Sequence, residues 1–202
     1  MNTINEAKSK LEISQLAQAA QVCGIASRSS LPLSVRAAVA KADASKQPLS
    51  IEELKEVCAS RQTSELAVKL LMADSCQIVD TARRELLKRQ PQLTLPGGDL
   101  YPEPRAEACW RDCQEFLRVI IYGVACNCAE ITDAAGMAAL RQLYTRMGVP
   151  VSAMMYALNQ MRILSSKTLE TSGQIHEMES LNMAFDDLTK ALQPNQPMES
   201  RS

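Results

Sequence analysis

Few residues in this chain favour a β-sheet. Aromatic residues make up 3% of the 202 residues, and there are only 7 glycines and one histidine. No segment alternates apolar and polar residues with the period of two that a half-buried strand needs. Alanine, leucine, methionine, glutamine, glutamate and arginine are abundant instead, and these residues favour helix. The composition therefore predicts an all-α fold.

A membrane-spanning segment is also missing. The longest apolar run, Val119–Cys126, is far shorter than the about 20 residues that cross a bilayer. The opening stretch, Met1–Ser14, contains Glu6 and Glu12 and has no apolar core. We therefore expect neither an export signal nor a basic transit peptide.

Neither sign of charge dominates. The chain has 22 Lys and Arg residues against 23 Asp and Glu residues, which leaves a formal net charge of -1 at pH 7. A nucleic-acid-binding domain needs a basic surface to neutralise phosphates, so this balance argues against that class of partner. With 46% hydrophobic residues, the chain has enough apolar material for one core in a single large domain.

The seven cysteines do not form a recognisable framework. Their number is odd, and without an export signal we expect reduced thiols. A zinc or redox site at Cys113, Cys126 and Cys128 is disfavoured, because paired Cys-x2-Cys spacing is missing and there is a single histidine. That histidine, His176, is expected on the surface. A thiol enzyme using Cys109 and Cys113 stays open as an alternative.

Apolar residues recur at helical spacing through most of the chain. A capping box at Ser50 and Glu53 marks one helix start, because each side chain can bond to the other's backbone amide. Thr132 or Asp133 caps a later helix that Gly148 ends. On the long helix from residue 64 we expect Leu66, Leu70, Ala73, Ile78 and Leu86 to face inward. The expected helices cover residues 7–24, 35–44, 50–61, 64–89, 107–125, 133–147, 150–168 and 175–192.

The chain divides into three predicted parts. Residues 1–33 form an N-terminal extension that we expect to be helical, residues 34–193 form the main domain, and residues 194–202 form a polar tail. Within the domain, the proline- and glycine-rich stretch 90–105 interrupts the helices. Ordered loops of this length commonly line a site, so we expect functional residues beside it.

The sharpest local pattern is Cys109-Trp110-Arg111-Asp112. Cys109 and Asp112 share a helix face, and Arg105 joins them if the helix begins by then. A thiol, a carboxylate and a guanidinium would then line one wall beside the loop, which could close over a ligand. Taken alone, the pattern also fits a core cysteine beside solvated charges, and Trp110 fits either a ligand contact or a cover for the core.

A longer pattern runs through the domain in seven segments. They are Ile78–Leu87, Gln90–Leu93, Pro96–Tyr101, Ala108–Asp112, Phe116–Arg118, Ala139–Tyr144 and Met147–Pro150. In this order and with few gaps, over about residues 35–191, they resemble the phycobiliprotein family, with allophycocyanin and phycocyanin subunits as the types most like them. The resemblance implies a globin-like helical domain preceded by a helical hairpin, here at about residues 35–61.

The resemblance also implies a pigment. In this family an open-chain tetrapyrrole, or bilin, is joined through a thioether to the cysteine that matches Cys109, and we expect phycocyanobilin. Asp112 would accept hydrogen bonds from the pyrrole N–H groups, while Arg111 and Arg105 would bind the propionates. Trp110 and Tyr144 are expected as further contacts of the pigment. The implied function is light absorption and energy transfer, not enzyme catalysis.

Some positions depart from the family pattern. Glu115 and Phe116 stand where allophycocyanin has two tyrosines, Asp99 replaces the asparagine of beta subunits, and Cys126-Asn127-Cys128 replaces the usual Ala-Gly-Asp. The first 33 or so residues have no counterpart in ordinary subunits. These departures indicate a divergent member and keep an alternative open, namely a bilin-free paralogue that acts as a regulatory, sensory or assembly module.

The resemblance further predicts partners and a location. Family subunits pair through the N-terminal hairpin and form rings, so we expect a dimer or higher oligomer with other phycobiliprotein subunits or with itself. Phycobilisome linker proteins are expected partners as well. The expected location is the cytoplasm, on the cytoplasmic face of thylakoid membranes.

Overall fold

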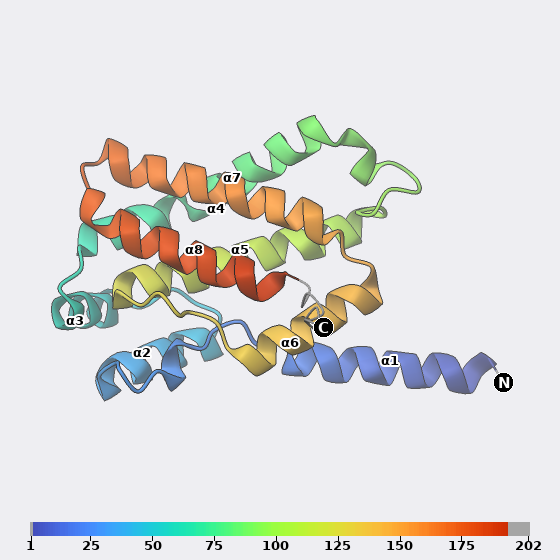
Figure 1. Cartoon of the computed structure of the whole chain (residues 1–202), viewed down its shortest axis with the longest axis horizontal. Coiled ribbons are helices and arrows are strands. Elements are labelled where there is room, and N and C mark those ends of the chain that lie inside the picture. The colour runs from blue at the N-terminus through green and yellow to red at the C-terminus, as the bar shows by residue number, and fades with distance from the viewer. Residues whose placement is uncertain (1, 194–202) are drawn as a thin grey trace, which may run out of the picture.

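The computed structural model describes residues 2–193, with side chains from Lys10 onward. The polar tail predicted for residues 194–202 lies outside the described residues. Helices make up nearly all of the regular structure (Figure 1), so the expected all-α fold is confirmed. The elements are α1 (Asn2–Ala19), η1 (Ile25–Ser27), α2 (Leu33–Ala44), α3 (Ile51–Arg61), α4 (Glu65–Arg89), η2 (Pro91–Thr94), α5 (Glu103–Cys126), α6 (Ala134–Met147), α7 (Val151–Thr171), η3 (Ile175–Glu177) and α8 (Met178–Leu192), where η denotes a short 3-10 helix.

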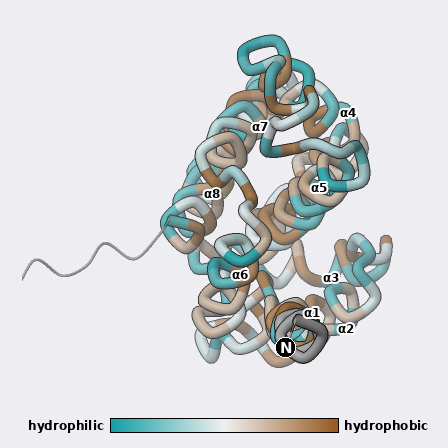
Figure 2. The backbone as a smooth tube through the Cα atoms, turned by 90° about the vertical axis from the view of Figure 1, so that its right-hand side faces the viewer, coloured by the Kyte–Doolittle hydropathy of each residue, from teal (hydrophilic) through white to brown (hydrophobic). Residues whose placement is uncertain are grey.

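Helices α4, α5, α7 and α8 form the main body. Helix α7 runs along α4, which also packs on α5, and α8 packs on both α5 and α7. The view in Figure 2 shows α1, α2 and α3 together on one side of this body. Every residue from Val119 to Cys126 is buried, so the longest apolar run of the sequence forms the centre of the core.

The hairpin of α2 and α3 follows the local sequence signals closely. Ser50 N donates to Glu53 Oε2 at 2.9 Å, and Glu53 N donates to Ser50 Oγ at 3.2 Å, so the predicted capping box is confirmed. A 2.7 Å ion pair between Lys41 and Glu53 joins the two helices. Leu33 and Ile51, the first residues of α2 and α3, are 73% and 71% exposed. The hairpin therefore presents apolar side chains to solvent.

The extension differs from the predicted helix over residues 7–24, because α1 ends at Ala19. The following residues are extended, and Cys23 forms an isolated antiparallel bridge with Thr132 in the α5–α6 connection. Gly24 allows this close approach, since a Cβ there would lie 2.3 Å from the carbonyl oxygen of Thr132. Main-chain pairing with a distant segment thus replaces the last turn of the predicted helix.

Two further helix starts differ from the prediction. Helix α5 begins at Glu103, four residues before the expected start, because Pro102 and Pro104 suit the end of a loop and a first helical turn. Arg105 is therefore inside α5, as its predicted role requires. Helix α8 begins at Met178, after the 3-10 turn η3 that covers the first predicted residues.

The buried face of α4 is only partly as predicted. Ile78 and Leu86 are buried, but Leu66 is 53% exposed and Ala73 is also exposed. The helix packs against both α5 and α7, so its buried face is set by two neighbours rather than by one apolar stripe. The positions that it buries are Ala67, Val68, Leu71, Ile78, Val79, Ala82 and Leu86.

The α5–α6 connection is held from two sides. Asp187 Oδ2 on α8 accepts hydrogen bonds from Ile131 N, Thr132 N and Thr132 Oγ1 at 2.9, 2.9 and 2.8 Å. From the other side, Arg28 donates to the carbonyl oxygens of Glu130 and Thr132 at 2.9 and 2.6 Å. These bonds connect the extension, the α5–α6 connection and α8.

Replacing the shared acceptor tests this arrangement. Asp187→Ala should lower the free energy of unfolding by about 1.5–3 kcal/mol, because three donors lose a charged acceptor. The matched control is Asp186→Ala, which removes a 63% exposed carboxylate paired with Arg162, and which should cost less than about 1 kcal/mol. Urea denaturation followed by circular dichroism measures both losses. Equal losses would show that Asp187 does not hold the connection.

Candidate functional site

Two residues of the predicted site, Cys109 and Trp110, face the core. They are 5% and 6% exposed. Together with Leu100 from the loop and Met154 from α7, they line a cavity of only about 10 Å³. Burial raises the pKa of the Cys109 thiol to about 11, and the carboxylate of Asp112 adds to the rise. The thiol is therefore protonated at neutral pH.

Asp112 and Tyr144 form a direct pair between α5 and α6. The Tyr144 hydroxyl donates to Asp112 Oδ2 at 2.6 Å, and Tyr144 is 3% exposed. Burial raises the pKa of Asp112, while the bond from Tyr144 and the charge of Arg111 oppose the rise. Burial, followed by the Asp112 carboxylate, raises the pKa of Tyr144. The carboxylate predicted to accept pyrrole N–H groups thus has a donor within the protein.

Arg105 fastens the loop after α4 to the α6–α7 turn. Its guanidinium donates to the carbonyl oxygens of Asp99, Met147 and Gly148, with a distance of 2.7 Å to Met147. Gly148 has a φ of 63° and ends α6, as the sequence predicted. The charge of Arg105 also opposes the rise in the pKa of Cys109. Arg105 also lies one turn before Cys109 on α5.

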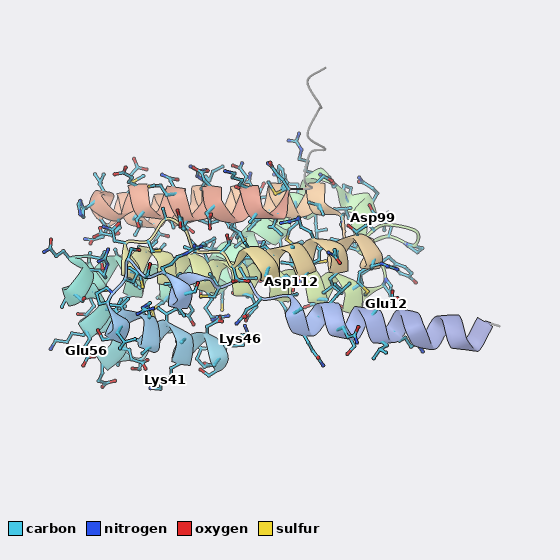
Figure 3. The ribbon with its side chains drawn as sticks, turned by 60° about the horizontal axis from the view of Figure 1, so that its bottom comes forward. Glu12, Lys41, Lys46, Glu56, Asp99 and Asp112 are labelled. Carbon is cyan, nitrogen blue, oxygen red and sulfur yellow. The ribbon has the colours of Figure 1, made fainter. Side chains whose placement is uncertain are left out.

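A larger cavity, of about 430 Å³, lies on another side of α5. Arg111 and Asp112 line it, whereas Cys109 does not. In Figure 3, Asp112 and Lys46 lie on the side of the molecule that carries α1 and α2. The sequence pattern predicted that the Cys109 thiol and the Asp112 carboxylate line one wall of the same site, but they line different cavities. The residues facing α5 across the larger one are Ala20, Val22, Asp43 and Lys46.

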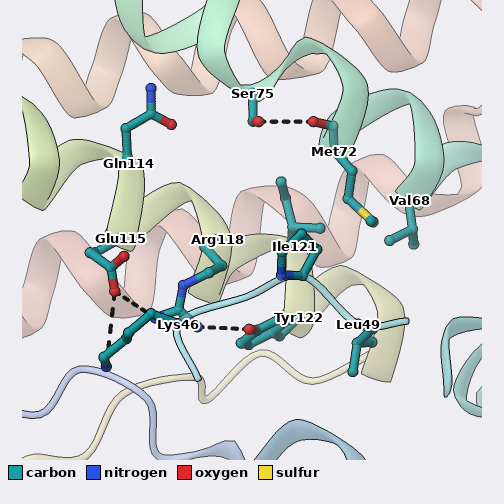
Figure 4. Close-up of a pocket in the computed structure, with 11 residues that line it drawn as sticks. Lys46, Leu49, Val68, Met72, Ser75, Gln114, Glu115, Arg118, Ile121 and Tyr122 are labelled. Atoms are coloured by element: carbon teal, nitrogen blue, oxygen red, sulfur yellow. Dashed lines mark hydrogen bonds and ion pairs between the residues drawn. The ribbon is translucent and has the colours of Figure 1, made fainter. Parts of the chain in front are cut away.

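A charge cluster that was not predicted from the sequence lies beside this cavity. Arg118 Nη1 lies 2.9 Å from Asp43 Oδ1, and its Nη2 lies 2.6 Å from Glu115 Oε2. Arg118 also donates to the hydroxyl of Tyr122 at 2.7 Å. Figure 4 shows Glu115, Arg118 and Tyr122 around an adjoining cavity of about 200 Å³. Polar residues at 111, 115, 118 and 122 recur at helical spacing on an apolar helix, which is the signal that could have found the cluster.

The metal-site and thiol-enzyme alternatives concern the cysteines and the single histidine. No group of three His, Cys, Asp or Glu side chains within residues 2–193 could hold a metal ion. His176 is exposed, as expected. Burial raises the pKa values of both Cys109 and Cys113, which is the opposite of what a nucleophilic thiol requires. In the same part of the chain, no helix is both long and apolar enough to cross a membrane.

The raised pKa of Asp112 predicts a pH-dependent stability. Folded Asp112 holds its proton more tightly than the unfolded chain does, so the wild type loses stability as the pH rises through the folded-state pKa. Asp112→Asn removes the charge and keeps an oxygen to accept from Tyr144. At pH 7 the variant should unfold at a higher urea concentration than the wild type, and the difference should vanish below about pH 4.

Asp80→Asn, at an exposed position on α4, is the control for loss of a carboxylate. It should leave the urea midpoint nearly unchanged at both pH values. A lower midpoint for Asp112→Asn than for the wild type at pH 7 would contradict the predicted sign.

Comparisons with known proteins agree with this fold. The model of the family described as "Phycobilisome protein" matches residues 37–192. The C-phycocyanin beta chain of Aglaothamnion neglectum is 33% identical over 127 residues, or 61% of this chain and 74% of the relative. The allophycocyanin alpha-B chain of a Synechococcus strain is 32% identical over 137 residues, or 66% of this chain and 84% of the relative.

One solved structure provides a comparison in three dimensions. It is a far-red fluorescent biliprotein derived from a far-red induced allophycocyanin F subunit of Chroococcidiopsis thermalis. It matches with a TM-score of 0.58 and 24% sequence identity, covering 63% of this chain and 93% of its own. This likeness concerns the fold, and with the family match it confirms the expected globin-like architecture.

Proposed function

Because the chain belongs to the phycobilisome protein family, we propose that it holds a linear tetrapyrrole through a thioether at Cys109. Proteins of this family are light-harvesting pigment proteins and not enzymes. The pigment, for which phycocyanobilin is our candidate, would supply the absorption of visible light. The observation that carries the proposal is that one turn of α5 bears Cys109, Arg111 and Asp112, with Asp112 at the edge of the 430 Å³ cavity.

Each residue has a distinct part in the proposal. Once the space around it has opened and burial no longer raises its pKa, Cys109 would add its S–H across a carbon–carbon double bond, so that the new C–S bond needs no oxidant and releases no leaving group. Asp112 would accept hydrogen bonds from pyrrole N–H groups. Arg111, whose side chain is exposed, would bind a propionate, as would Arg105 after it releases its carbonyl partners. Tyr144 would then contact the pigment from α6.

These residues suit a tetrapyrrole in their chemistry, but the space beside the thiol has to open. Ligand sites typically have volumes of about 300–1,000 Å³. The cavity at Cys109 has about 10 Å³, whereas the one at Asp112 has about 430 Å³. Tyr144 bonds to Asp112 but does not line the small cavity at Cys109. Attachment at the thiol therefore requires the lining of the small cavity, including Leu100 and Met154, to move apart.

Substitution of the thiol tests the proposal. Co-expression of the wild type with bilin-synthesis enzymes and a bilin lyase should give protein that keeps its colour in acidic urea, because a thioether survives unfolding. Cys109→Ser should lose all pigment under these conditions. Cys76→Ser, at an exposed position on α4, should keep it. A colourless wild type, or pigment that stays on Cys109→Ser in acidic urea, would contradict the thioether.

A second candidate function is a bilin-free assembly, sensory or regulatory module. The observation in its favour is that the polar groups of the site already have partners: Tyr144 bonds to Asp112, and Arg105 bonds to backbone carbonyls. A colourless protein from its native cells that still binds phycobiliprotein subunits would favour this function over pigment binding.

Proteins of the family assemble with other subunits. We extend this to the present chain and propose that it pairs through the α2–α3 hairpin, with a phycobiliprotein subunit or a second copy. The support is the exposure of Leu33 and Ile51 on this hairpin. Phycobilisome linker proteins and the cytoplasmic face of thylakoid membranes are the partners and location that we propose from the family alone.

The hairpin proposal predicts the effect of one charge. Ile51→Glu should weaken self-association or binding to a phycobiliprotein subunit, because it places a carboxylate on an apolar contact surface. Lys55→Glu, at an exposed position on the same helix, controls for the added negative charge. Sedimentation velocity measures both variants. An unchanged sedimentation coefficient for Ile51→Glu in the associated state would show that the contact lies elsewhere.

A further inference from the structure

We infer that the N-terminal extension is the outer wall of the pigment site, so that the 430 Å³ cavity binds a linear tetrapyrrole even without the thioether. The inference rests on the proposed function for the class of ligand. It concerns Ala20 and Val22, which line the cavity together with Asp112. Both residues precede the range 37–192 that matches the family. The wall is therefore a feature of this chain outside the family domain.

The wall is fixed to the main body by its own backbone. Asp133 N, at the start of α6, donates to the carbonyl oxygen of Val22 at 2.9 Å. A Cβ at Gly136 would lie 1.9 Å from the carbonyl oxygen of Gln21, so the glycine lets the segment pass directly against α6. Arg28 then bonds to the α5–α6 connection. The segment is thus held where it closes one side of the cavity.

The charged groups around the cavity suit the polar groups of a linear tetrapyrrole, which are pyrrole N–H donors and two propionates. Arg111 is exposed and forms no ion pair with any residue that the structure describes. Lys46 Nζ lies 3.6 Å from Asp43 and 3.9 Å from Glu115, which is too long for hydrogen bonds. Arg111 and Lys46 can each donate hydrogen bonds to a propionate, while Asp112 can accept them from pyrrole N–H groups.

The remaining lining suits flat, apolar rings. Phe116 and Val119 from α5 and Leu140 from α6 contribute apolar surface, and Val22 adds to it from the extension. A volume of about 430 Å³ also lies within the range of ordinary ligand sites, about 300–1,000 Å³. Three carboxylates, Asp43, Asp112 and Glu115, also line the cavity, and Arg118 pairs with the first and the last of them. The size of the cavity, its apolar walls and the two cations that remain, Lys46 and Arg111, together favour this ligand over a small polar metabolite.

The first experiment removes the thiol and keeps the full chain. Cys109→Ser protein is titrated with free biliverdin, a linear tetrapyrrole with two propionates, and binding is followed by absorption. Binding should be saturable and should quench the emission of Trp110, the one tryptophan of the chain. Adding Arg111→Gln should weaken binding by about tenfold, because one charge-assisted hydrogen bond is lost.

The second experiment tests the wall itself. In the Cys109→Ser background, Val22→Phe places a larger side chain in the cavity and should weaken biliverdin binding by about tenfold. The matched control is Gln18→Phe, at an exposed position on α1, which should leave the affinity unchanged. Circular dichroism checks that both variants remain folded, so weaker binding caused by a changed cavity is distinguished from weaker binding caused by unfolding.

The outcomes separate this inference from the proposed function. Absence of saturable binding to folded Cys109→Ser protein would overturn the inference, as would equal affinities of Val22→Phe and Gln18→Phe. A wild type without covalent pigment, together with biliverdin binding that depends on Val22 and Arg111, would overturn the thioether and support the wall. Covalent pigment at Cys109 with no effect of Val22→Phe would support the thioether and overturn the inference about the wall.

Discussion

The burial of α5 among α4, α7 and α8 is the constraint on which the rest of the molecule depends. Its last residues, Val119–Cys126, are all buried, so its charged side chains are confined to the part before them, some of them on the side that faces α2 and the extension. That side carries Arg111, Glu115 and Arg118, and its charges are neutralised in part by Asp43. Cys109 lies on a different side of the same helix and therefore faces the core.

The polar groups that are proposed to bind the ligand also form hydrogen bonds that stabilise the fold. Tyr144 bonds to Asp112, and Arg105 joins two loops through backbone carbonyls. Bonds to charged groups contribute about 1.5–3 kcal/mol each, so opening the site has a cost that a ligand must offset. A tetrapyrrole offers N–H donors and carboxylates, which in the proposed function would replace Tyr144 at Asp112 and the backbone carbonyls at Arg105. The two functions considered for this chain differ in whether that exchange takes place.

The extension is attached to the family domain through backbone atoms rather than side chains alone. The bridge between Cys23 and Thr132 and the bonds from Arg28 join it to the same connection that Asp187 holds from α8. Division of the chain at residue 33 stays a prediction. In the structure, however, residues 20–28 pack on the main body and complete a cavity, so their role is tied to that cavity.

The sequence by itself determined the features that depend on neighbouring residues: the helical class, the capping box at Ser50, the end of α6 at Gly148 and the buried run in α5. It left the cap of α6 open between Thr132 and Asp133, and the structure decided for Asp133. The sequence also located the resemblance that gave the family. Only the tertiary structure decided where α1 ends, which face α4 buries and which partner Arg118 has, since each depends on residues far away along the chain. The same holds for Cys109 and Asp112, because a turn of about 60° around the helix axis is enough to direct two side chains three residues apart to different neighbours.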